Sequence, residues 1–370
     1  MNEYDVIIVG GSFAGLATAY FTQAENLLII EKEKEIGARQ RSTCGAPVDW
    51  VRRLGAERSI LRTFDTITIH SPNGGELIID LPMPYCTIDY RTFCASVAEH
   101  LKNAEIRTGT EVTGVEAGDP GKVLCGHEAY SSGLIVDASG WRAAVASRLK
   151  HGYAHLPRRI AGLETVAEYD ADSIHIYFGN KLIPGGYAWV FPLTGGLSRV
   201  GLGSLKKVNL MDLNRRFLDF LGIEHFEAEH HGGIIPCLGM RDPVVGDIFV
   251  VGDAAGQVLP GTAEGIRKAF IYAEVLGGLI SRVLKGELER SRALEIYRQE
   301  VLRSKKFYDI MLTIQNIAYN APDWVLERVI GKVKSDRSIL KRLLRVYFEE
   351  DSGHANMNSL LASLKHILKR

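Results

Sequence analysis

The sequence has no net charge. Its 44 Lys and Arg residues balance 44 Asp and Glu residues over 370 positions. A strongly basic surface for nucleic acid is therefore not expected. A hydrophobic fraction of 46% combined with zero net charge also excludes a disordered chain. The length predicts two or three domains, or one large split fold.

Cysteines are few, odd in number and widely spaced, and no two of them form a CxxC pair. This argues against zinc ribbons and iron–sulfur clusters, and no metal site is expected. It also favours a reducing, cytosolic setting. The five residues are Cys44, Cys86, Cys94, Cys125 and Cys237.

A long hydrophobic run suited to a membrane is also missing. Residues 6–24 carry no charge, but three glycines interrupt them. The acidic residues Glu3 and Asp5 precede them, where a signal peptide requires Lys or Arg. We therefore expect a buried strand and a packed helix here, with neither a transmembrane segment nor a targeting signal.

Glycine, in contrast, is abundant. The chain has 38 glycines and only 12 prolines, so glycine makes up about 10% against about 7% in an average protein. Glycine without proline does not fit collagen or a low-complexity chain. It predicts many sharp turns or close approaches of the backbone.

The expected elements run in the order α/β, β, α/β and α. Residues 4–31 are predicted to form a βαβ unit, 64–81 a hairpin, and 89–104 an amphipathic helix. Strand-like runs between 164 and 205 are typical of an antiparallel sheet. A buried strand at 248–251 precedes a helix near position 265, and the chain after position 291 is mostly helical. A dinucleotide-binding domain interrupted by a sheet domain gives this order, so the predicted class is α/β (α+β overall).

A glycine-rich turn follows the first predicted strand. Gly10 and Gly15 take the first and third glycine places of a dinucleotide-binding fingerprint, and Ser12 replaces the middle glycine. Glu31 ends the second strand, where an acid accepts hydrogen bonds from ribose hydroxyls. The alternative is an ordinary βαβ unit with a glycine-rich turn.

A second glycine-rich segment spans residues 247–266. A buried strand leads to Gly252 and Asp253, and a second glycine cluster with Gly261 and Gly265 opens a helix. Such a carboxylate can accept hydrogen bonds from ribityl hydroxyls, while the helix N-terminus favours negative charge on a ring oxygen. The alternative is a strand followed by a capped helix.

On these two motifs, residues 1–290 resemble the p-hydroxybenzoate hydroxylase-like FAD-dependent oxidoreductases. The resemblance implies FAD, with Glu31 on the adenosine ribose and Asp253 on the ribityl chain. Residues 137–140 resemble the third turn that this superfamily places beside FAD. The basic candidates, each of which could equally be a solvated surface charge, are Arg39 or Arg41 and Arg91. The full implied cofactor set is Gly10, Ser12, Phe13, Ala14, Gly15, Glu31, Lys32, Arg39, Arg41, Arg91, Val112, Ala138, Gly252, Asp253, Gly261, Gly265 and Ile266.

The resemblance also implies a domain organisation. A Rossmann-like FAD-binding domain would take residues 1–63, 82–155 and 236–290. An inserted antiparallel-sheet substrate domain would take residues 64–81 and 156–235. Residues 291–370 would form a C-terminal helical region.

Residues 184–192 resemble the PxxYxWxFP signature of the geranylgeranyl reductase family. Their aromatic residues Tyr187, Trp189 and Phe191 alternate, so they point to one face of a strand. Three aromatic rings on one face could line an apolar tunnel for a polyprenyl chain and so bind substrate. The alternative is a sheet face packed on its own core.

The segment around Cys44 and Gly45 resembles the Cys-Gly loop that this family places near the flavin. The match is partial, because Pro47 stands where the family pattern continues to a further glycine. Cys44 is therefore either a catalytic residue, acting as proton donor or redox partner, or an inert buried residue.

The family resemblance implies an FAD-dependent reductase that hydrogenates carbon–carbon double bonds of a geranylgeranyl group on a lipid or diphosphate. Reduced flavin would deliver hydride from N5 to one carbon while a proton reaches the other. The alternatives are an FAD-dependent NAD(P)H monooxygenase and a non-catalytic flavin- or lipid-binding protein. A flavin halogenase is disfavoured because its WxWxIP motif is absent. The electron donor stays open among ferredoxin, NAD(P)H and a quinone.

The C-terminal residues 360–368 have leucine and isoleucine at helical spacing beside basic residues. This pattern fits a helix docked on its own domain or an interfacial helix that gives peripheral contact with a membrane. The expected localisation is cytoplasmic, with any such contact on the cytoplasmic face.

Overall fold

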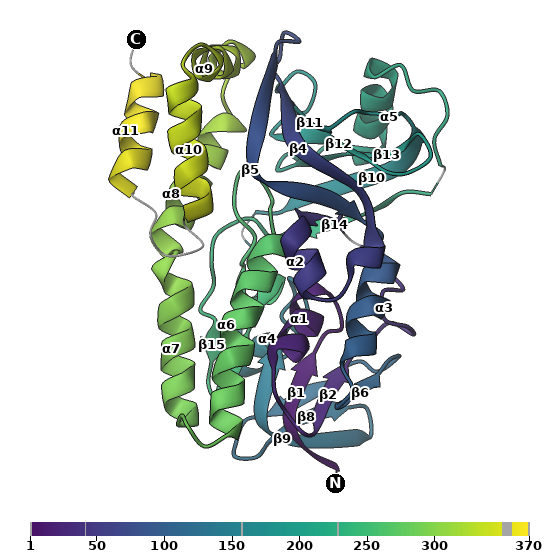
Figure 1. The fold of residues 1–370 in the computed structure, drawn as a ribbon, viewed down its shortest axis with the longest axis vertical. Helices are drawn as coiled ribbons and strands as arrows, with labels where there is room; N and C mark the ends of the chain where they lie inside the picture. Colours follow the sequence, from purple (N-terminus) through teal and green to yellow (C-terminus); the bar gives the residue numbers. More distant parts are fainter. Residues whose placement is uncertain (1, 41, 157, 228, 350–356, 369–370) are drawn as a thin grey trace.

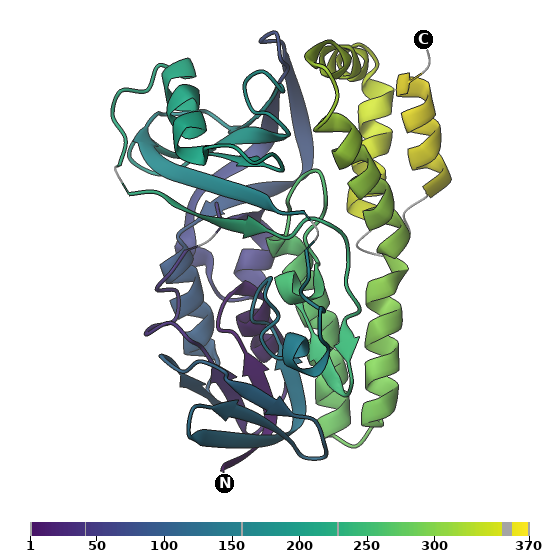
Figure 2. The ribbon, with the colours of Figure 1, turned by 180° about the vertical axis from the view of Figure 1, so that it is seen from behind.

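The structure is a computed structural model that describes residues 2–40, 42–156, 158–227, 229–349 and 357–368. Two sheets lie one above the other along the long axis, and a column of C-terminal helices runs beside both (Figures 1 and 2). This α/β arrangement with a C-terminal helical segment confirms the predicted fold class. Among the described residues, no helix is both long and apolar enough to span a bilayer.

The first sheet has the order β15-β16-β9-β1-β2-β6, with β8 and β7 continuing from β9. Pairing within β16-β9-β1-β2-β6 is parallel, as buried β-branched strands predict. The strands are β1 (Asn2–Val9), β2 (Leu27–Ile30), β6 (Ala104–Arg107), β7 (Gly114–Glu116), β8 (Gly121–Cys125), β9 (Glu128–Asp137), β15 (Val244–Val245) and β16 (Ile248–Val250).

Helices cover one face of this sheet. Val6, Ile8 and Ile29 pack against them, whereas Ile7 and Leu28 point to the opposite face, because side chains alternate along a strand. The covering helices are α1 (Phe13–Phe21), α3 (Tyr90–His100) and α6 (Ile266–Leu284), and α4 (Ala146–Leu149) lies on the other face. Helix α3 is shorter than predicted, because residues 101–103 turn the chain into β6.

The second sheet has the order β14-β10-β13-β12-β11-β4-β5-β3. Every neighbouring pair is antiparallel except β11 and β4, which run parallel. The prediction of a purely antiparallel sheet is therefore wrong for this one pair. The predicted hairpin exists as β4 and β5. No hairpin can join β4 to β11, because parallel strands need a crossover connection, and here 103 residues lie between His70 and Ile174. The strands are β3 (Gly45–Pro47), β4 (Ile60–His70), β5 (Glu76–Ile88), β10 (Ile160–Glu168), β11 (Ile174–Phe178), β12 (Gly186–Pro192), β13 (Leu197–Ser204) and β14 (His231–Ile235).

The second sheet also takes in residues 45–47, 60–63 and 82–88, which the predicted boundaries give to the FAD-binding domain. Helix α5 (Leu210–Phe220) covers one face of this sheet. The other face, with Tyr187 and Trp189, packs on Val258 and Tyr319. Short helical turns are α2 (Val48–Arg53), η1 (Glu57–Ser59) and η2 (Gly252–Ala255).

Helices α7 and α8 form a column that rises past the first sheet, and α9 to α11 gather beside the second (Figure 1). Leu360 of α11 is buried on this bundle and Leu361 is exposed, while the side chains of 364–368 lie outside the described residues. The bounds are α7 (Arg290–Arg303), α8 (Lys305–Ala318), α9 (Asp323–Ser335), α10 (Arg337–Glu349) and α11 (Met357–Leu368).

Candidate active site

The turn after β1 is packed so closely that two of its positions accept only glycine. A Cβ atom on Gly15 would lie 1.8 Å from the Gly10 carbonyl oxygen, and one on Gly10 would lie 2.4 Å from that of Ala138. Gly10 also has a φ of 110°. The structure therefore brings the predicted first turn and the residue 138 turn together. Ser12 precedes α1, and its Oγ accepts a hydrogen bond from the Tyr90 hydroxyl (2.9 Å).

The Glu31 carboxylate lies over the same turn. Its Oε2 accepts the Gly11 N–H (2.7 Å) and its Oε1 accepts the Glu33 N–H (2.9 Å). The acid predicted to bind ribose is thus fixed beside the start of α1. Of the other predicted contacts near it, Phe13 is buried against the rings of Tyr90 and Phe93.

The predicted basic contacts are less well placed than Glu31. Lys32 and Arg39 are exposed, and Arg91 is exposed and paired with Glu35. Arg41 lies outside the described residues. Val112 is buried in the core of the first sheet. The cofactor roles of these residues stay predictions.

The second glycine-rich segment meets the first. A Cβ atom on Gly252 would lie 2.6 Å from the Ala14 Cβ, and one on Gly265 would lie 3.6 Å from the Asp253 Oδ1. The Asp253 side chain thus sits close to the start of α6, where Ile266 is the first helical residue. Burial raises the pKa of Asp253 to about 6, and the positive charge of Arg241 opposes this shift.

Arg241 is a site residue that the sequence analysis missed. Its Nη1 donates to the carbonyl oxygens of Trp141 (2.9 Å) and Ala254 (3.0 Å). Its Nη2 is buried and has no hydrogen-bond partner among the described residues. Burial lowers the pKa of its guanidinium. An unpaired buried donor beside glycine turns fits an anionic group such as the pyrophosphate of FAD. A lone arginine before a short strand gave no signal for this.

The aromatic residues of β12 lie together on the face turned to the helices, as their alternation predicts. The Tyr187 and Trp189 rings are 5.9 Å apart. Tyr187 donates its hydroxyl to the Thr262 carbonyl oxygen (2.9 Å), within the loop that holds Gly261. Phe191 packs on Gly45, where a Cβ atom would lie 2.7 Å from its ring. The strand therefore touches both loops that the sequence assigns to the flavin. The tunnel itself stays a prediction.

Cys44 is fully buried and has a left-handed backbone with a φ of 63°. Such a conformation is strained for a residue other than glycine, and it recurs at functional loops. Its thiol donates to the Ser42 carbonyl oxygen (3.0 Å). Burial raises the pKa of the thiol far above its usual range, so the sulfur holds its proton.

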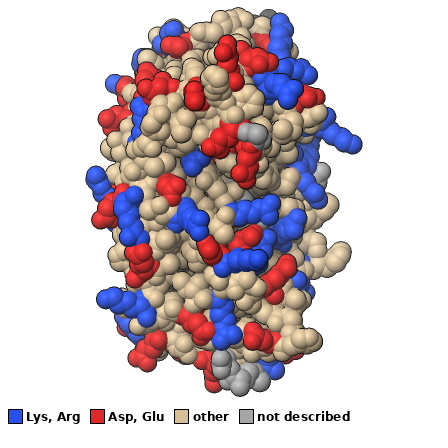
Figure 3. Space-filling view, turned by 90° about the vertical axis from the view of Figure 1, so that its right-hand side faces the viewer, with Lys and Arg blue, Asp and Glu red and all other residues tan. Residues whose placement is uncertain are grey.

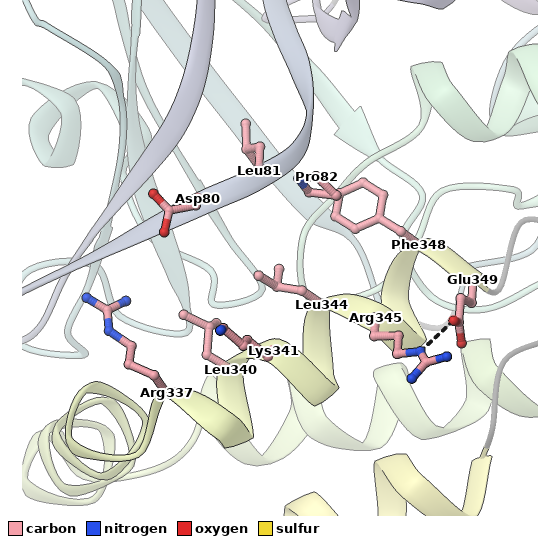
Figure 4. Close-up of a pocket in the computed structure, with 10 residues that line it drawn as sticks. All are labelled: Asp80, Leu81, Pro82, Arg337, Leu340, Lys341, Leu344, Arg345, Phe348 and Glu349. Atoms are coloured by element: carbon pink, nitrogen blue, oxygen red, sulfur yellow. Dashed lines mark hydrogen bonds and ion pairs between the residues drawn. The ribbon is translucent and has the colours of Figure 1, made fainter.

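A groove of about 920 Å³ lies between β5 and α10 (Figure 4). Basic side chains lie along it, with Arg337 at one end and Arg345 at the other, paired with Glu349 (2.6 Å). Apolar side chains form its walls. They are Leu81, Pro82, Leu340, Leu344 and Phe348. Elsewhere the surface is mixed, and acidic and basic side chains are interspersed over the face seen in Figure 3.

Comparisons with known proteins agree with this geometry. A family model of the geranylgeranyl reductase catalytic domain matches residues 160–239. The chain is 27% identical to digeranylgeranylglycerophospholipid reductase 2 of Methanothermobacter thermautotrophicus, over 93% of this chain and 97% of that protein.

Solved structures share the fold. A geranylgeranyl bacteriochlorophyll reductase-like protein from Thermoplasma acidophilum superposes with a TM-score of 0.83, at 17% identity, over 100% of this chain and 97% of that one. PqsL of Pseudomonas aeruginosa, described as "a probable FAD-dependent monooxygenase", gives a TM-score of 0.69 at 16% identity, over 86% and 97%.

These findings confirm the predicted resemblance to the geranylgeranyl reductases, and the shared fold agrees with the predicted cofactor, FAD. The glycine turns, the Glu31 and Asp253 carboxylates and the unpaired Arg241 donor fit that cofactor. The chain is therefore similar over nearly its whole length to the geranylgeranyl reductases, and it shares its fold with FAD-dependent oxidoreductases.

Proposed function

We propose that this enzyme saturates carbon–carbon double bonds in a geranylgeranyl group carried by a lipid or a diphosphate. The observation that carries the proposal is the catalytic-domain match over residues 160–239, which contains the aromatic strand β12. The contacts of this strand with Thr262 and Gly45 support the proposal, because they connect an apolar surface to both predicted flavin loops.

Reduced FAD, when bound, supplies the hydride for this reaction. The chain has three tasks of its own. The residues around Glu31, Asp253 and Arg241 bind the cofactor, and the rings of β12 hold the prenyl chain and exclude water. Cys44 holds a proton at Sγ that one alkene carbon can receive, after which the thiolate takes a proton back from solvent. The high pKa of this thiol makes it a weak acid, so it gives up the proton only as negative charge develops on carbon.

The experiment is a reduction without air. The purified yellow protein is reduced with dithionite, mixed with a geranylgeranyl lipid, and the lipid is analysed by mass spectrometry. We expect products heavier by two hydrogen atoms for each bond saturated, and none from the oxidised protein. Absence of such products with every prenyl substrate tried would contradict the proposal.

A flavin monooxygenase is the second candidate, favoured by the fold shared with PqsL. It predicts rapid oxidation of the reduced flavin by air together with a hydroxylated product. A non-catalytic flavin or lipid carrier predicts tight lipid binding with neither product. The electron donor is proposed from the same three classes, ferredoxin, NAD(P)H or a quinone, and stopped-flow flavin reduction with each one identifies it.

We also propose peripheral contact with an anionic lipid surface through the groove between β5 and α10. The groove has apolar walls on β5 and α10, and its basic residues Arg337, Lys341 and Arg345 outnumber its acidic residues Asp80 and Glu349, which suits a lipid with a negative head group. Lys341→Gln should weaken sedimentation with anionic vesicles, whereas Lys285→Gln, an exposed residue at the end of α6 and outside the groove, should not. Equal sedimentation of both variants would contradict this contact.

A further inference from the structure

A buried carboxylate, Glu164 of β10, connects two other strands of the second sheet with the segment that precedes β3. Its Oε2 accepts hydrogen bonds from the Thr43 hydroxyl (2.6 Å) and from the Trp189 indole N–H (2.9 Å). Its Oε1 lies 2.5 Å from the Nε2 of His231. Only 4% of the Glu164 side chain is exposed, against 28% for His231, so the imidazole is the solvent side of the cluster.

Arg199 of β13 completes the cluster. Its Nη1 donates to the Thr43 carbonyl oxygen (3.1 Å) and its Nη2 to the Gln40 Oε1 (3.1 Å). Burial alone would raise the pKa of Glu164, but the hydrogen bond and charge of His231, the Thr43 hydroxyl and the Arg199 charge hold it below its usual value. Glu164 is therefore a carboxylate in the folded protein.

The backbone is shaped to admit this contact. A Cβ atom on Gly201 would lie 2.5 Å from the Glu164 Cβ and 2.7 Å from the Trp189 Cε2. Any larger residue at position 201 would therefore separate Glu164 from Trp189. The approach of these two side chains is built into the sheet.

A buried ionic cluster is a costly way to gain stability, because well-packed apolar residues of similar volume are often as stable or more so. Its members do, however, lie at the proposed site. Thr43 precedes Cys44, and Trp189 stands between Tyr187 and Phe191 on the aromatic strand. One carboxylate thus fixes both the aromatic strand and the segment that leads to Cys44.

We propose that Glu164, with His231 as its hydrogen-bond partner, is a positioning residue that fixes the Trp189 indole relative to the Thr43–Cys44 segment. The inference rests on the proposed function for its substrate, but the positioning itself can be measured without substrate. Glu164 acts through Trp189 and Thr43 and is not itself a catalytic residue.

The first test uses protein labelled with ¹⁵N in tryptophan and free of FAD. The indole N–H resonance of Trp189, assigned with Trp189→Phe, should lie downfield and exchange slowly with solvent. Glu164→Leu should shift it and speed its exchange, and Glu164→Gln should shift it less, because an amide oxygen can still accept. Glu168→Gln, at the exposed end of the same strand, is the matched control. An unchanged resonance in Glu164→Leu would overturn the proposal whatever the substrate.

The second test uses the loaded enzyme. Glu164→Leu should lower kcat/KM for the geranylgeranyl lipid by about 10- to 100-fold, since small misplacements near a reacting centre have effects of this order. Glu164→Gln should recover part of the loss, because its amide oxygen can still accept from the Trp189 indole. The same melting temperature and flavin content as wild type would show that the fold is intact. A wild-type kcat/KM in Glu164→Leu would overturn the proposal.

The pH profile separates positioning from simple packing. Without His231, the pKa of Glu164 should rise, because the largest influence holding it down is gone, while Arg199 and Thr43 still face it. The acid limb of the rate profile should therefore move to higher pH in His231→Asn, and an unmoved limb would count against the proposal. If no prenyl lipid is reduced while the indole resonance responds as expected, the proposed function fails and the positioning role stands.

Discussion

The proposed site has two halves, one on each sheet, and they differ in whether backbone atoms or side chains form the surface. On the first sheet, the surface is mostly backbone, because glycines at 10, 15 and 252 let three turns approach one another within contact distance. On the second sheet, the surface is side chain, with aromatic rings on β12 and a buried carboxylate that holds one of them.

This difference has a physical cause. FAD carries oxygen atoms along much of its length, and backbone N–H groups and helix N-termini can recognise them. Small side chains leave these backbone groups accessible. An isoprenoid chain offers no polar atoms to recognise, so only the shape and position of apolar side chains can hold it. Binding in the first half should therefore be weakened most by substitutions that enlarge a side chain, and binding in the second half by substitutions that remove a side-chain contact.

The largest effect is expected at Gly15. Gly15→Ala places a methyl group where the Gly10 carbonyl oxygen stands, so either the turn or α1 must move. We expect a loss of about 3 kcal/mol or more in unfolding free energy, together with loss of FAD binding. Urea unfolding and flavin content measure the two effects.

Gly278→Ala is the control for this change. Gly278 is also helical, but a Cβ atom there meets nothing within 4 Å. The change should stabilise α6 by about 0.5–1 kcal/mol. Similar behaviour of the two variants would refute the view that backbone proximity defines the first half of the site.

Arg241 is an exception in the first half of the site, because there a side chain, and not the backbone, would contact the cofactor. Arg241→Met removes the unpaired Nη2 and keeps an apolar stem. FAD affinity should fall by about 10- to 100-fold, which corresponds to the loss of a charge-assisted hydrogen bond. The change also removes the Nη1 hydrogen bonds to the Trp141 and Ala254 carbonyl oxygens, so the melting temperature of the FAD-free protein should fall, and it measures that structural loss separately from FAD affinity. Titration of the FAD-free protein with FAD, followed by flavin fluorescence, decides the point, and an unchanged Kd would remove Arg241 from the site.

A smaller, pH-dependent effect is expected at Asp253, whose pKa is raised to about 6 by burial. As pH falls from 7 to 5 its carboxylate is protonated, and a neutral acid is a weaker acceptor for hydroxyl groups. FAD affinity should therefore fall by up to about tenfold over this range.

The stability of the FAD-free protein should follow the opposite trend. Because the folded state binds the proton more tightly than the unfolded state, Asp253 destabilises the fold as pH rises toward 6. In Asp253→Asn both pH dependences should flatten. If FAD affinity falls equally with pH in that variant, Asp253 is not the titrating group.

The two halves also differ in what the sequence could predict. The spacing of Gly10, Gly15 and Glu31 predicts a βαβ turn because those residues lie within 22 consecutive positions of the chain. Glu164, Trp189 and His231 come together only through strand pairing, and nothing local marks Glu164 as buried. Arg241 was missed for the same reason. The parallel pairing of β4 with β11 likewise depends on the path of the chain between them, and it cannot be predicted from the residues of either strand.

The smallest expected effect is at the contact between the two halves. Tyr187→Phe keeps the ring but removes the hydrogen bond to the Thr262 carbonyl oxygen, which then has to find another partner. Unfolding free energy should fall by about 0.5–1.5 kcal/mol. If the contact also aligns the aromatic strand with the loop at Gly261, KM for the prenyl lipid should rise while FAD affinity stays constant. Phe178→Leu, which alters a ring packed on Tyr187 without touching Thr262, is the control for lost packing. A fall in FAD affinity in Tyr187→Phe would mean that the second sheet supports the cofactor loop directly, and the division between a backbone half and a side-chain half would have to be abandoned.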